Sequence, residues 1–213
     1  AERFSEERQA ARRALLQASA ALGQWLQQQI DGGSAEAAMA LIERQRRTMG
    51  EMLALALAEK RFDEAQNILQ PLDAFWDARG LAVEARGWVD QVRSTVADSR
   101  GVPDFAGEAG QLWLFTVGSE ANRALRAGDL EEAERACDEI RRRLEEAAPG
   151  TTRDRQLATI YHQLGIVAQH RGDSAGAEAW YRKSLAILKA LDDRRGMASS
   201  YHQLGMVAED RGD

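Results

Sequence analysis

Apolar side chains recur at intervals of three and four residues along most of the chain. This is the spacing of one face of an α-helix, and residues 158–173 show it with the stripe Ile160, Tyr161, Leu164, Val167 and Ala168. The segments 4–30, 34–59 and 174–193 follow the same spacing. The pattern predicts an all-α protein of about nine helices.

Glycine and aspartate separate the predicted helices. Gly172 can take the positive φ that ends a helix, and Asp173 with Ser174 can cap the next one. Each unit is therefore predicted to be a helix, a tight turn and a second, antiparallel helix. Further upstream we expect a turn at Lys60–Arg61 and a helix start at Ser34, which can act as an N-cap.

Two segments depart from the helical pattern. Pro71 falls inside a helical stretch, and because proline cannot donate a backbone hydrogen bond, a kink or a restarted helix is expected there. Residues 99–107, SRGVPDFAG, are the candidate for an extended loop.

One phrase occurs twice, forty residues apart. Residues 158–173 and 198–213 align without a gap and share 11 of 16 positions, which establishes an internal repeat. Two helices that cross closely leave no room for large side chains, so Gly165 and Ala177 are expected at the crossing, with Tyr181 filling the space around it. Such units bury their apolar faces only against their neighbours and stack into an array.

The repeated unit resembles the tetratricopeptide (TPR) repeat in its longer-helix variety. The resemblance rests on Tyr-x-x-Leu-Gly-x-x-Ala, then Gly-Asp, then Ala-x-x-x-Tyr. It is closest over 152–213 and weakens through 112–148 to 64–97, with helix-ending glycines at Gly80, Gly128, Gly172 and Gly212. It implies a right-handed α-solenoid, a TPR-like superhelix of antiparallel helix pairs.

The pattern divides the chain into three segments. We expect an N-terminal amphipathic helix and linker at 1–33, divergent TPR-like units at 34–100 and regular units at 108–213. The last unit stops after its first helix, 197–211. We therefore expect either a chain cut short or a terminal face that stacks on another chain, with apolar residues offered to a missing partner at Tyr201, Leu204 and Ala208.

Residues 46–97 have a second resemblance. An Ala/Leu-rich helix followed by FWDARG and EARGWVDQV is similar to the opening of the helical-repeat sensor regions of bacterial STAND-type signalling ATPases and large transcription regulators. In those proteins the repeats follow a nucleotide-binding switch domain, whereas this sequence has no phosphate-binding glycine loop. The resemblance implies a sensor or interaction fragment of a larger bacterial signalling protein.

Composition narrows the possible partners and the compartment. The 213 residues carry a formal net charge of −6, whereas duplex nucleic acid is usually bound by a basic surface, so no nucleic-acid partner is expected. A single cysteine, Cys137, excludes an internal disulfide and favours a reducing, cytoplasmic location. No apolar run approaches a membrane span, and the charged first residues do not form a signal peptide, so no membrane association is expected.

The candidate reactive groups have architectural explanations. Arg-Gly-Asp at 171–173 and 211–213 could suggest adhesion, but Gly ends one helix there and Asp caps the next. His162 and His202 recur without an accompanying Asp, Glu or Cys, so they form either a ligand-facing ladder or plain repeat consensus. Cys137 is expected to be buried, as are the tryptophans Trp25, Trp76, Trp88, Trp113 and Trp180. We predict no catalytic, cofactor-binding or metal-binding residues, and no enzyme.

The TPR resemblance also implies a binding surface. In TPR proteins the first helix of each unit lines the concave face, so side chains that point away from its partner helix are the candidates: Phe115, Asn122, Thr159, His162, Ile166, Gln169, Ser199, His202, Met206 and Glu209. Such a mixture suits a protein or peptide ligand in a groove. The alternatives are a regulatory domain that binds a small inducer, and a structural array that self-associates through its uncapped C-terminal end.

Overall fold

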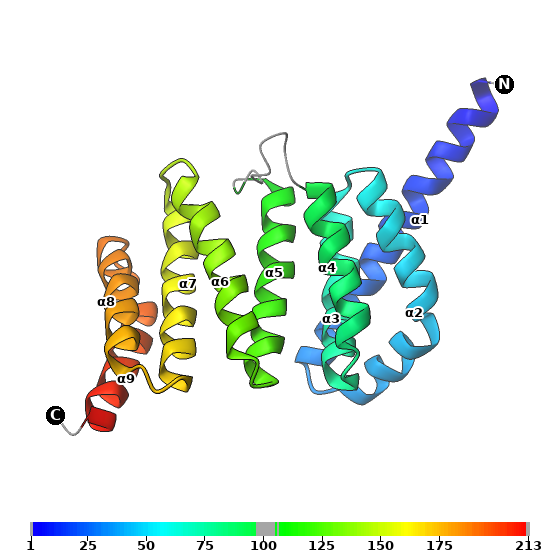
Figure 1. Ribbon diagram of the computed structural model, residues 1–213. Coiled ribbons are helices and arrows are strands. Elements are labelled where there is room, and N and C mark those ends of the chain that lie inside the picture. The colour runs from blue at the N-terminus through cyan, green and yellow to red at the C-terminus, as the bar shows by residue number, and fades with distance from the viewer. Residues whose placement is uncertain (1, 97–104, 106, 212–213) are drawn as a thin grey trace. The chain divides into compact units, whose positions relative to one another are not determined.

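The computed structural model describes residues 2–96, 105 and 107–211, with side chains described from residue 6 onwards. Within these ranges the chain is all-α, without strands (Figure 1). The helices are α1 (Glu2–Asp31), α2 (Ala35–Ala58), α3 (Phe62–Arg79), α4 (Ala82–Val96), α5 (Glu108–Arg126), α6 (Leu130–Glu146), α7 (Thr151–His170), α8 (Ser174–Ala190) and α9 (Arg194–Arg211). The predictions of an all-α fold and of nine helices are confirmed for this part of the chain.

The chain forms two compact units. Unit 1 comprises residues 1–103 and 108–113, and unit 2 comprises residues 104–107 and 114–213. The expected loop at 99–107 lies outside the described residues, apart from Phe105 and Gly107.

Unit 1 is built around α3, which contacts α1, α2 and α4. Its core consists of large apolar side chains that are almost completely buried, including Leu16, Leu26, Ile42, Leu53, Ile68, Leu72, Phe75 and Trp76. The first half of α1 lies outside this core, because residues 6–15 are all exposed, and Figure 1 shows this half projecting beyond the other helices of the unit.

Pro71 lies inside α3, and the helix continues through it from Phe62 to Arg79. Of the two alternatives expected at this position, the restarted helix is wrong, and the kink stays a prediction. Proline at 71 cannot donate to the carbonyl of Asn67, four residues earlier. That carbonyl lies against Gly23 of α1, where an added Cβ atom would stand 2.9 Å from the Asn67 carbonyl carbon. The carbonyl that Pro71 cannot bond therefore lies at a close contact between α1 and α3.

In unit 2 successive helices pack side by side. Helix α7 contacts α6 and α8, and α8 contacts α9 (Figure 1). One core cluster joins α5, α6 and α7 through Ala124, Ala133 and Val167. A second joins α7, α8 and α9 through Ala168, Ala177, Tyr181 and Val207. Each cluster spans three consecutive helices, as the stacking of helix pairs requires.

The predicted turn chemistry is present between these helices. Gly128 and Gly172 have φ of 76° and 75°, in the left-handed region that favours glycine. The carboxylate of Asp129 accepts from the Glu132 amide at 3.0 Å, and that of Asp173 accepts from the Gly176 amide at 2.9 Å. Gly80 also has positive φ, 67°, whereas Gly212 lies outside the described residues. Arg-Gly-Asp at 171–173 is therefore a helix junction.

The close crossing of α7 and α8 is also confirmed. A Cβ atom on Gly165 would stand 2.6 Å from Cδ1 of Tyr181, so only glycine fits there without moving the ring. Beside this contact the rings of Tyr161 and Trp180 stack at 5.6 Å. The tyrosine and glycine of the repeated phrase thus fix how the two helices pack.

Two further expectations fail in part. Trp25 is 48% exposed, so it is not a core residue, although Trp76 and Trp113 are buried and Trp88 and Trp180 half-buried. Ser34 stands at the start of α2, but its side chain makes no capping hydrogen bond to the described residues. Periodicity identifies a stripe on a helix but does not say whether another helix covers it.

Candidate functional site

The predicted surface residues divide into an exposed and a half-buried group. The exposed group comprises Asn122, Thr159, Ser199, His202, Met206 and Glu209. The half-buried group comprises Phe115, His162, Ile166 and Gln169. Three matching pairs, His162 and His202, Ile166 and Met206, and Gln169 and Glu209, are half-buried on α7 and exposed on α9, whereas Thr159 and Ser199 are both exposed.

The half-buried side chains of α7 are engaged with α8 and α9. The hydroxyl of Tyr181 donates to Oε1 of Gln169 at 2.9 Å, and Nε2 of Gln169 donates to Oδ2 of Asp210 at 3.4 Å. The ring of His162 lies 5.3 Å from that of Tyr181. These contacts hold the side chains in fixed orientations at the junction of three helices.

Ile166 is held at the same junction, because it packs against the cluster of Ala168, Ala177, Tyr181 and Val207. In α5, Phe115 is half-buried while its neighbour Trp113 is only 4% exposed, so Phe115 is the more accessible of this aromatic pair.

Burial sets the protonation of the aromatic groups at this junction. Desolvation lowers the pKa of His162 below its usual 6.5 and raises the pKa of Tyr181 to about 12. Both groups are therefore neutral at pH 7, and they act here as packing and hydrogen-bonding groups. They supply no charge to the surface.

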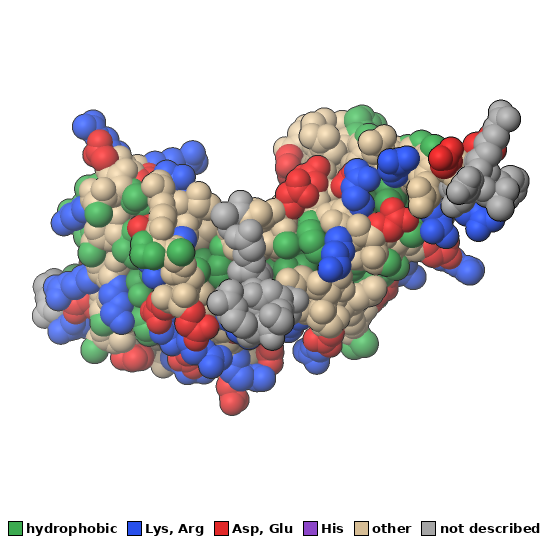
Figure 2. All heavy atoms as spheres, turned by 90° about the horizontal axis from the view of Figure 1, so that it is seen from above, with side chains coloured by type: hydrophobic (Ala, Val, Ile, Leu, Met, Phe, Trp, Pro, Cys, Tyr) green, Lys and Arg blue, Asp and Glu red, His purple; other side chains and the backbone are tan. Residues whose placement is uncertain are grey.

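The charged residues of unit 2 are paired across and along the helices. Arg141 donates from Nε to Asp138 at 2.8 Å and from Nη1 to Glu145 at 2.7 Å. The hydroxyl of Tyr161 donates to the same Glu145 at 2.9 Å. On the face that Figure 2 shows, Lys and Arg side chains lie among Asp and Glu side chains. This arrangement gives no extended surface of one sign there.

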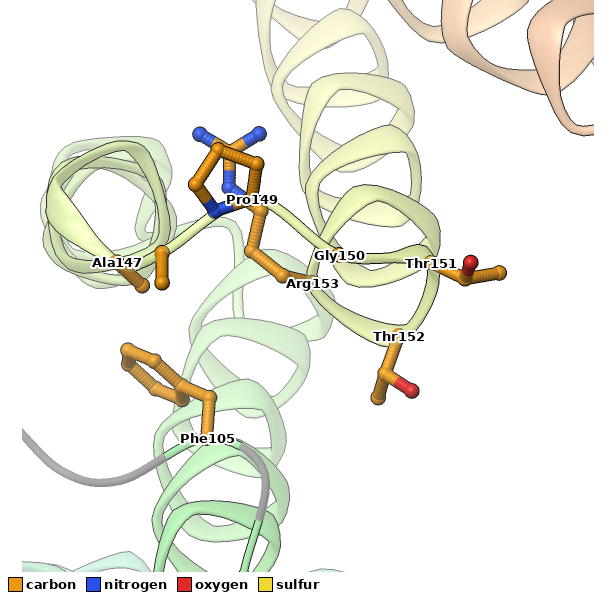
Figure 3. A pocket seen from close by; sticks show the side chains of 8 residues that line it. Phe105, Ala147, Pro149, Gly150, Thr151, Thr152 and Arg153 are labelled. Atoms are coloured by element: carbon orange, nitrogen blue, oxygen red, sulfur yellow. The ribbon is translucent and has the colours of Figure 1, made fainter.

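A cavity of about 360 Å³ lies where α6 is joined to α7. Figure 3 shows the ring of Phe105 on one side of it and Ala147 and Pro149 of the connecting segment on the other. Arg153, the one charged residue among the described residues that line it, donates to the carbonyl oxygen of Leu144 at 2.8 Å and to Asp154 at 2.6 Å. Because the guanidinium of Arg153 is already hydrogen-bonded to Leu144 and Asp154, it is not directed at a ligand. The cavity therefore offers packing surface and gives no indication of catalysis.

Two further hollows lie in the described part of the chain. One of about 200 Å³ lies between α8 and α9 and is lined by Glu178, Arg182, Leu204, Val207, Ala208 and Arg211. The other, of about 450 Å³, lies in unit 1 between α2, α3 and α4, where Trp76 and Trp88 stack at 6.4 Å. Charges beside this second hollow are paired, as Arg46 lies 3.5 Å from Glu84 and Arg47 lies 3.1 Å from Glu51.

Reactive side chains are scarce in the described ranges. These ranges contain no group of three His, Cys, Asp or Glu residues that could hold a metal ion. Cys137 is buried, as expected, and burial together with the nearby Asp138 and Glu134 charges raises the pKa of its thiol to about 12. The thiol is thus protonated at pH 7 and unsuited to act as a nucleophile.

Sequence reasoning missed two contributions to these interfaces. Gly23 of α1 lies at a close helix crossing like that of Gly165. Both glycines follow a leucine, and this shared Leu-Gly dipeptide could have predicted the crossing at Gly23. Asp210 binds Gln169 from the neighbouring helix. No local signal identified this contact, because it joins residues of two different units of the repeat.

The stacked helix pairs define the class of the protein, which is a TPR-like helical solenoid. A family model described as the tetratricopeptide repeat matches residues 156–213, which hold α8, α9 and most of α7, and this match supports a TPR repeat protein. Proteins of this repeat family generally mediate protein–protein interactions and are generally not catalysts. No curated protein and no solved structure matches the chain.

Among the helices described, none combines the length and the apolar character that a membrane crossing requires.

Proposed function

We propose that the protein is a non-enzymatic scaffold that binds a protein or peptide segment on the surface formed by α5, α7 and α9. The observation that carries this proposal is the exposed set of unlike side chains on α7 and α9, Thr159, Ser199, His202, Met206 and Glu209, beside a rigid junction. A hydroxyl, an imidazole, a thioether and a carboxylate can together bind backbone amides and apolar side chains of an extended segment. The match to the TPR family supports this role.

We place the chain in the sensor or interaction part of a larger bacterial signalling protein of the STAND type, working in the cytoplasm. This part of the proposal rests on the resemblance of residues 46–97 and on the single cysteine. Sequencing of the gene on both sides of the segment tests it. An upstream phosphate-binding loop is expected, and a complete gene that encodes no nucleotide-binding domain would contradict it.

Selection from a library of displayed random peptides tests the binding function. Enriched peptides are expected to bind the chain saturably. Combined Thr159→Ala, His202→Ala and Met206→Ala substitutions are expected to weaken binding roughly tenfold or more, since a few residues carry most of the energy of an interface and truncation of one of them costs over about 1 kcal/mol. All three residues are exposed, so the fold is expected to persist.

Val83→Ala serves as the matched control, because Val83 is 88% exposed on α4. This variant is expected to bind the selected peptides as the unsubstituted chain does. Equal affinity of the triple variant and the Val83 variant would place the binding elsewhere and overturn the proposed surface.

A small-ligand regulatory domain is the first alternative. It is favoured by the hollow of about 450 Å³ in unit 1, where Nε1 of the buried Trp76 has no hydrogen-bond acceptor among the described residues. A thermal-shift screen of small aromatic compounds tests it, with Gly50→Leu as the cavity-filling variant beside Trp88. Compounds that raise the Tm of the unsubstituted chain but not of the variant would favour this alternative.

Self-association through the C-terminal end is the second alternative. It is favoured by the exposure of Tyr201, 50%, and of Met206, 41%, on α9. Light scattering over a range of concentrations tests it. A mass that rises with concentration would support it, and a strict monomer at high concentration would exclude it.

A further inference from the structure

The hollow in unit 1 is lined by a tryptophan whose indole nitrogen has no acceptor. This hollow, of about 450 Å³, lies between α2, α3 and α4, and both Trp76 and Trp88 line it. Trp76 is only 1% exposed, and its Nε1 has no hydrogen-bond partner in the described part of the chain. A buried donor without an acceptor is costly, because it has given up its hydrogen bonds to water. An acceptor bound in the hollow would remove that cost.

Trp88 occupies the same position in its helix pair as Trp180 does in unit 2. Each lies eight residues after the glycine that ends the preceding helix. In unit 2 the ring of Trp180 stacks on that of Tyr161, with ring centres 5.6 Å apart. The ammonium group of Lys183 lies 4.1 Å from the centre of the same indole. The tryptophan of unit 2 is thus covered by both an aromatic ring and a cation.

Unit 1 lacks the side chains that cover the indole in unit 2. Counted from the same glycines, Leu69 takes the position of the tyrosine, and Gln91 takes that of the lysine. Gly50 of α2 leaves further space, because it has no side chain and the position of a Cβ atom on it is 3.4 Å from Cζ2 of Trp88. Trp88 is consequently half-buried, and a hollow remains beside its ring.

The four charged residues that line the hollow favour an uncharged ligand. Arg46 lies 3.5 Å from Glu84, and Arg47 lies 3.1 Å from Glu51. The guanidinium of Arg46 also lies 5.9 Å from the centre of the Phe75 ring. A charged ligand would have to compete with one of these ion pairs, whereas an uncharged one leaves both intact.

We propose that the hollow in unit 1 binds an uncharged planar aromatic molecule that carries a hydrogen-bond acceptor. The ring of the ligand packs on the indole of Trp88 beside Gly50, and its acceptor receives the hydrogen bond from Nε1 of Trp76. Because Nε1 is buried, the half-buried ring of Trp88 turns aside as the ligand enters. This proposal gives the small-ligand alternative its class of ligand, and it does not rest on peptide binding by unit 2.

Quinoline and naphthalene are a matched pair of probes for this site. They share one fused-ring shape and are uncharged at neutral pH, but only quinoline has a ring nitrogen that accepts a hydrogen bond. NMR of the ¹⁵N-labelled chain follows the indole N–H signals, and Trp76→Phe identifies the Trp76 signal by its loss. Quinoline is expected to shift this signal downfield and saturably. Naphthalene is expected to bind several-fold more weakly and to cause no such downfield shift.

Three variants locate the ligand. Gly50→Leu is expected to weaken quinoline binding roughly tenfold or more, because the added side chain fills the space beside Trp88. Gly205→Leu, at an exposed helical glycine of α9 with open space around it, is the matched control and is expected to leave binding unchanged. Trp76→Phe keeps an aromatic ring without the donor, so quinoline and naphthalene are expected to bind this variant equally.

The comparison of the two probes on the unsubstituted chain needs no variant, so it decides the proposal even if a substitution disturbs folding. Absence of a saturable shift of the Trp76 signal up to the solubility limit of quinoline would overturn the proposal. Equal affinity of quinoline and naphthalene for the unsubstituted chain would overturn it as well, and so would unchanged quinoline binding by Gly50→Leu. None of these results alters what is expected for peptide binding by unit 2, which the peptide selection tests separately.

Discussion

At the scale of single residues, identical amino acids in the repeated phrase have different environments. Gly165 is enclosed by the ring of Tyr181, whereas Gly205 is exposed. His162 is half-buried beside the same ring, whereas His202 is exposed. Because each pair shares its residue type and its position in a helix, substitution at both members separates the effect of packing from the effect of helix propensity.

Alanine at these two glycines is predicted to have opposite effects on stability. Gly165→Ala places a Cβ atom 2.6 Å from Tyr181 Cδ1 and is expected to lower the free energy of unfolding by roughly 1–3 kcal/mol through overpacking. Gly205→Ala adds a methyl group in open space and is expected to raise it by about 0.5–1 kcal/mol, because alanine favours a helix over glycine. Urea unfolding of the two variants measures both changes, and destabilisation of equal size would contradict the assigned contacts.

Protonation of His162 is predicted to make stability depend on pH. Burial lowers its pKa in the folded chain below the ordinary value of 6.5, so the unfolded chain binds more protons as the pH falls through that value. The free energy of unfolding is therefore expected to decrease as the pH is lowered from 7.5 to 5, and His162→Gln is expected to reduce that dependence. His202→Gln, at the exposed equivalent, is the control in denaturant titrations at each pH. If His202→Gln reduces the pH dependence of the free energy of unfolding more than His162→Gln does, the assignment of that dependence to His162 is contradicted.

At the scale of helices, junction chemistry decides where each helix begins. Asp129 and Asp173 each accept from a backbone amide in the first turn that follows, whereas Ser34 occupies the same position without such a bond to the described residues. Aspartate and serine both favour the N-cap position, so the residue type alone does not decide whether the cap forms. The backbone differs instead, because ψ is 31° at Ser34 and 77° at both Asp129 and Asp173.

Removal of these caps is predicted to cost unequal amounts. Asp129→Ala loses the bond to the Glu132 amide and is expected to reduce the free energy of unfolding by about 1 kcal/mol. Ser34→Ala removes no such bond and is expected to reduce the free energy of unfolding by much less than Asp129→Ala does. Thermal unfolding of the two variants provides the comparison, and a larger loss of Tm for Ser34→Ala would contradict the cap assignment.

The sequence was sufficient to predict elements whose cause is local. Helix spacing, the positive φ of Gly172 and the small residue at the α7–α8 crossing all follow from residues within one unit. Features that depend on another element were missed. Trp25 is exposed despite its place on an apolar stripe, and α3 continues through Pro71 without the restart that was one of the two alternatives expected there.

The candidate surface shows the same limit. Its residues could be chosen by their position in the repeat, but which of them are covered depends on the neighbouring helix. Gln169 binds Tyr181 and Asp210, while Glu209 at the matching position is exposed. The difference arises because α7 and α9 are not covered by the same neighbouring helices. The repeated phrase alone therefore does not predict which of its residues are buried.

At the scale of the whole molecule, the proposal assigns partner binding to unit 2. The surface of α7 and α9 combines exposed polar and apolar side chains with a rigid three-helix junction, and rigid surfaces lose less conformational entropy on binding. Paired charges and mixed signs on the face seen in Figure 2 favour a protein segment over a polyanion. Four of the five methionines provide natural probes, since Met206 lies on the proposed surface and Met39, Met49 and Met52 lie on α2 in unit 1.

Methyl NMR of the methionine-labelled chain during titration with a selected peptide tests the central claim most directly. The account predicts that the Met206 signal shifts saturably, with the same dissociation constant as the binding assay, while the signals of Met39, Met49 and Met52 stay in place. Shifts confined to the α2 methionines, with Met206 unchanged at saturation, would contradict it.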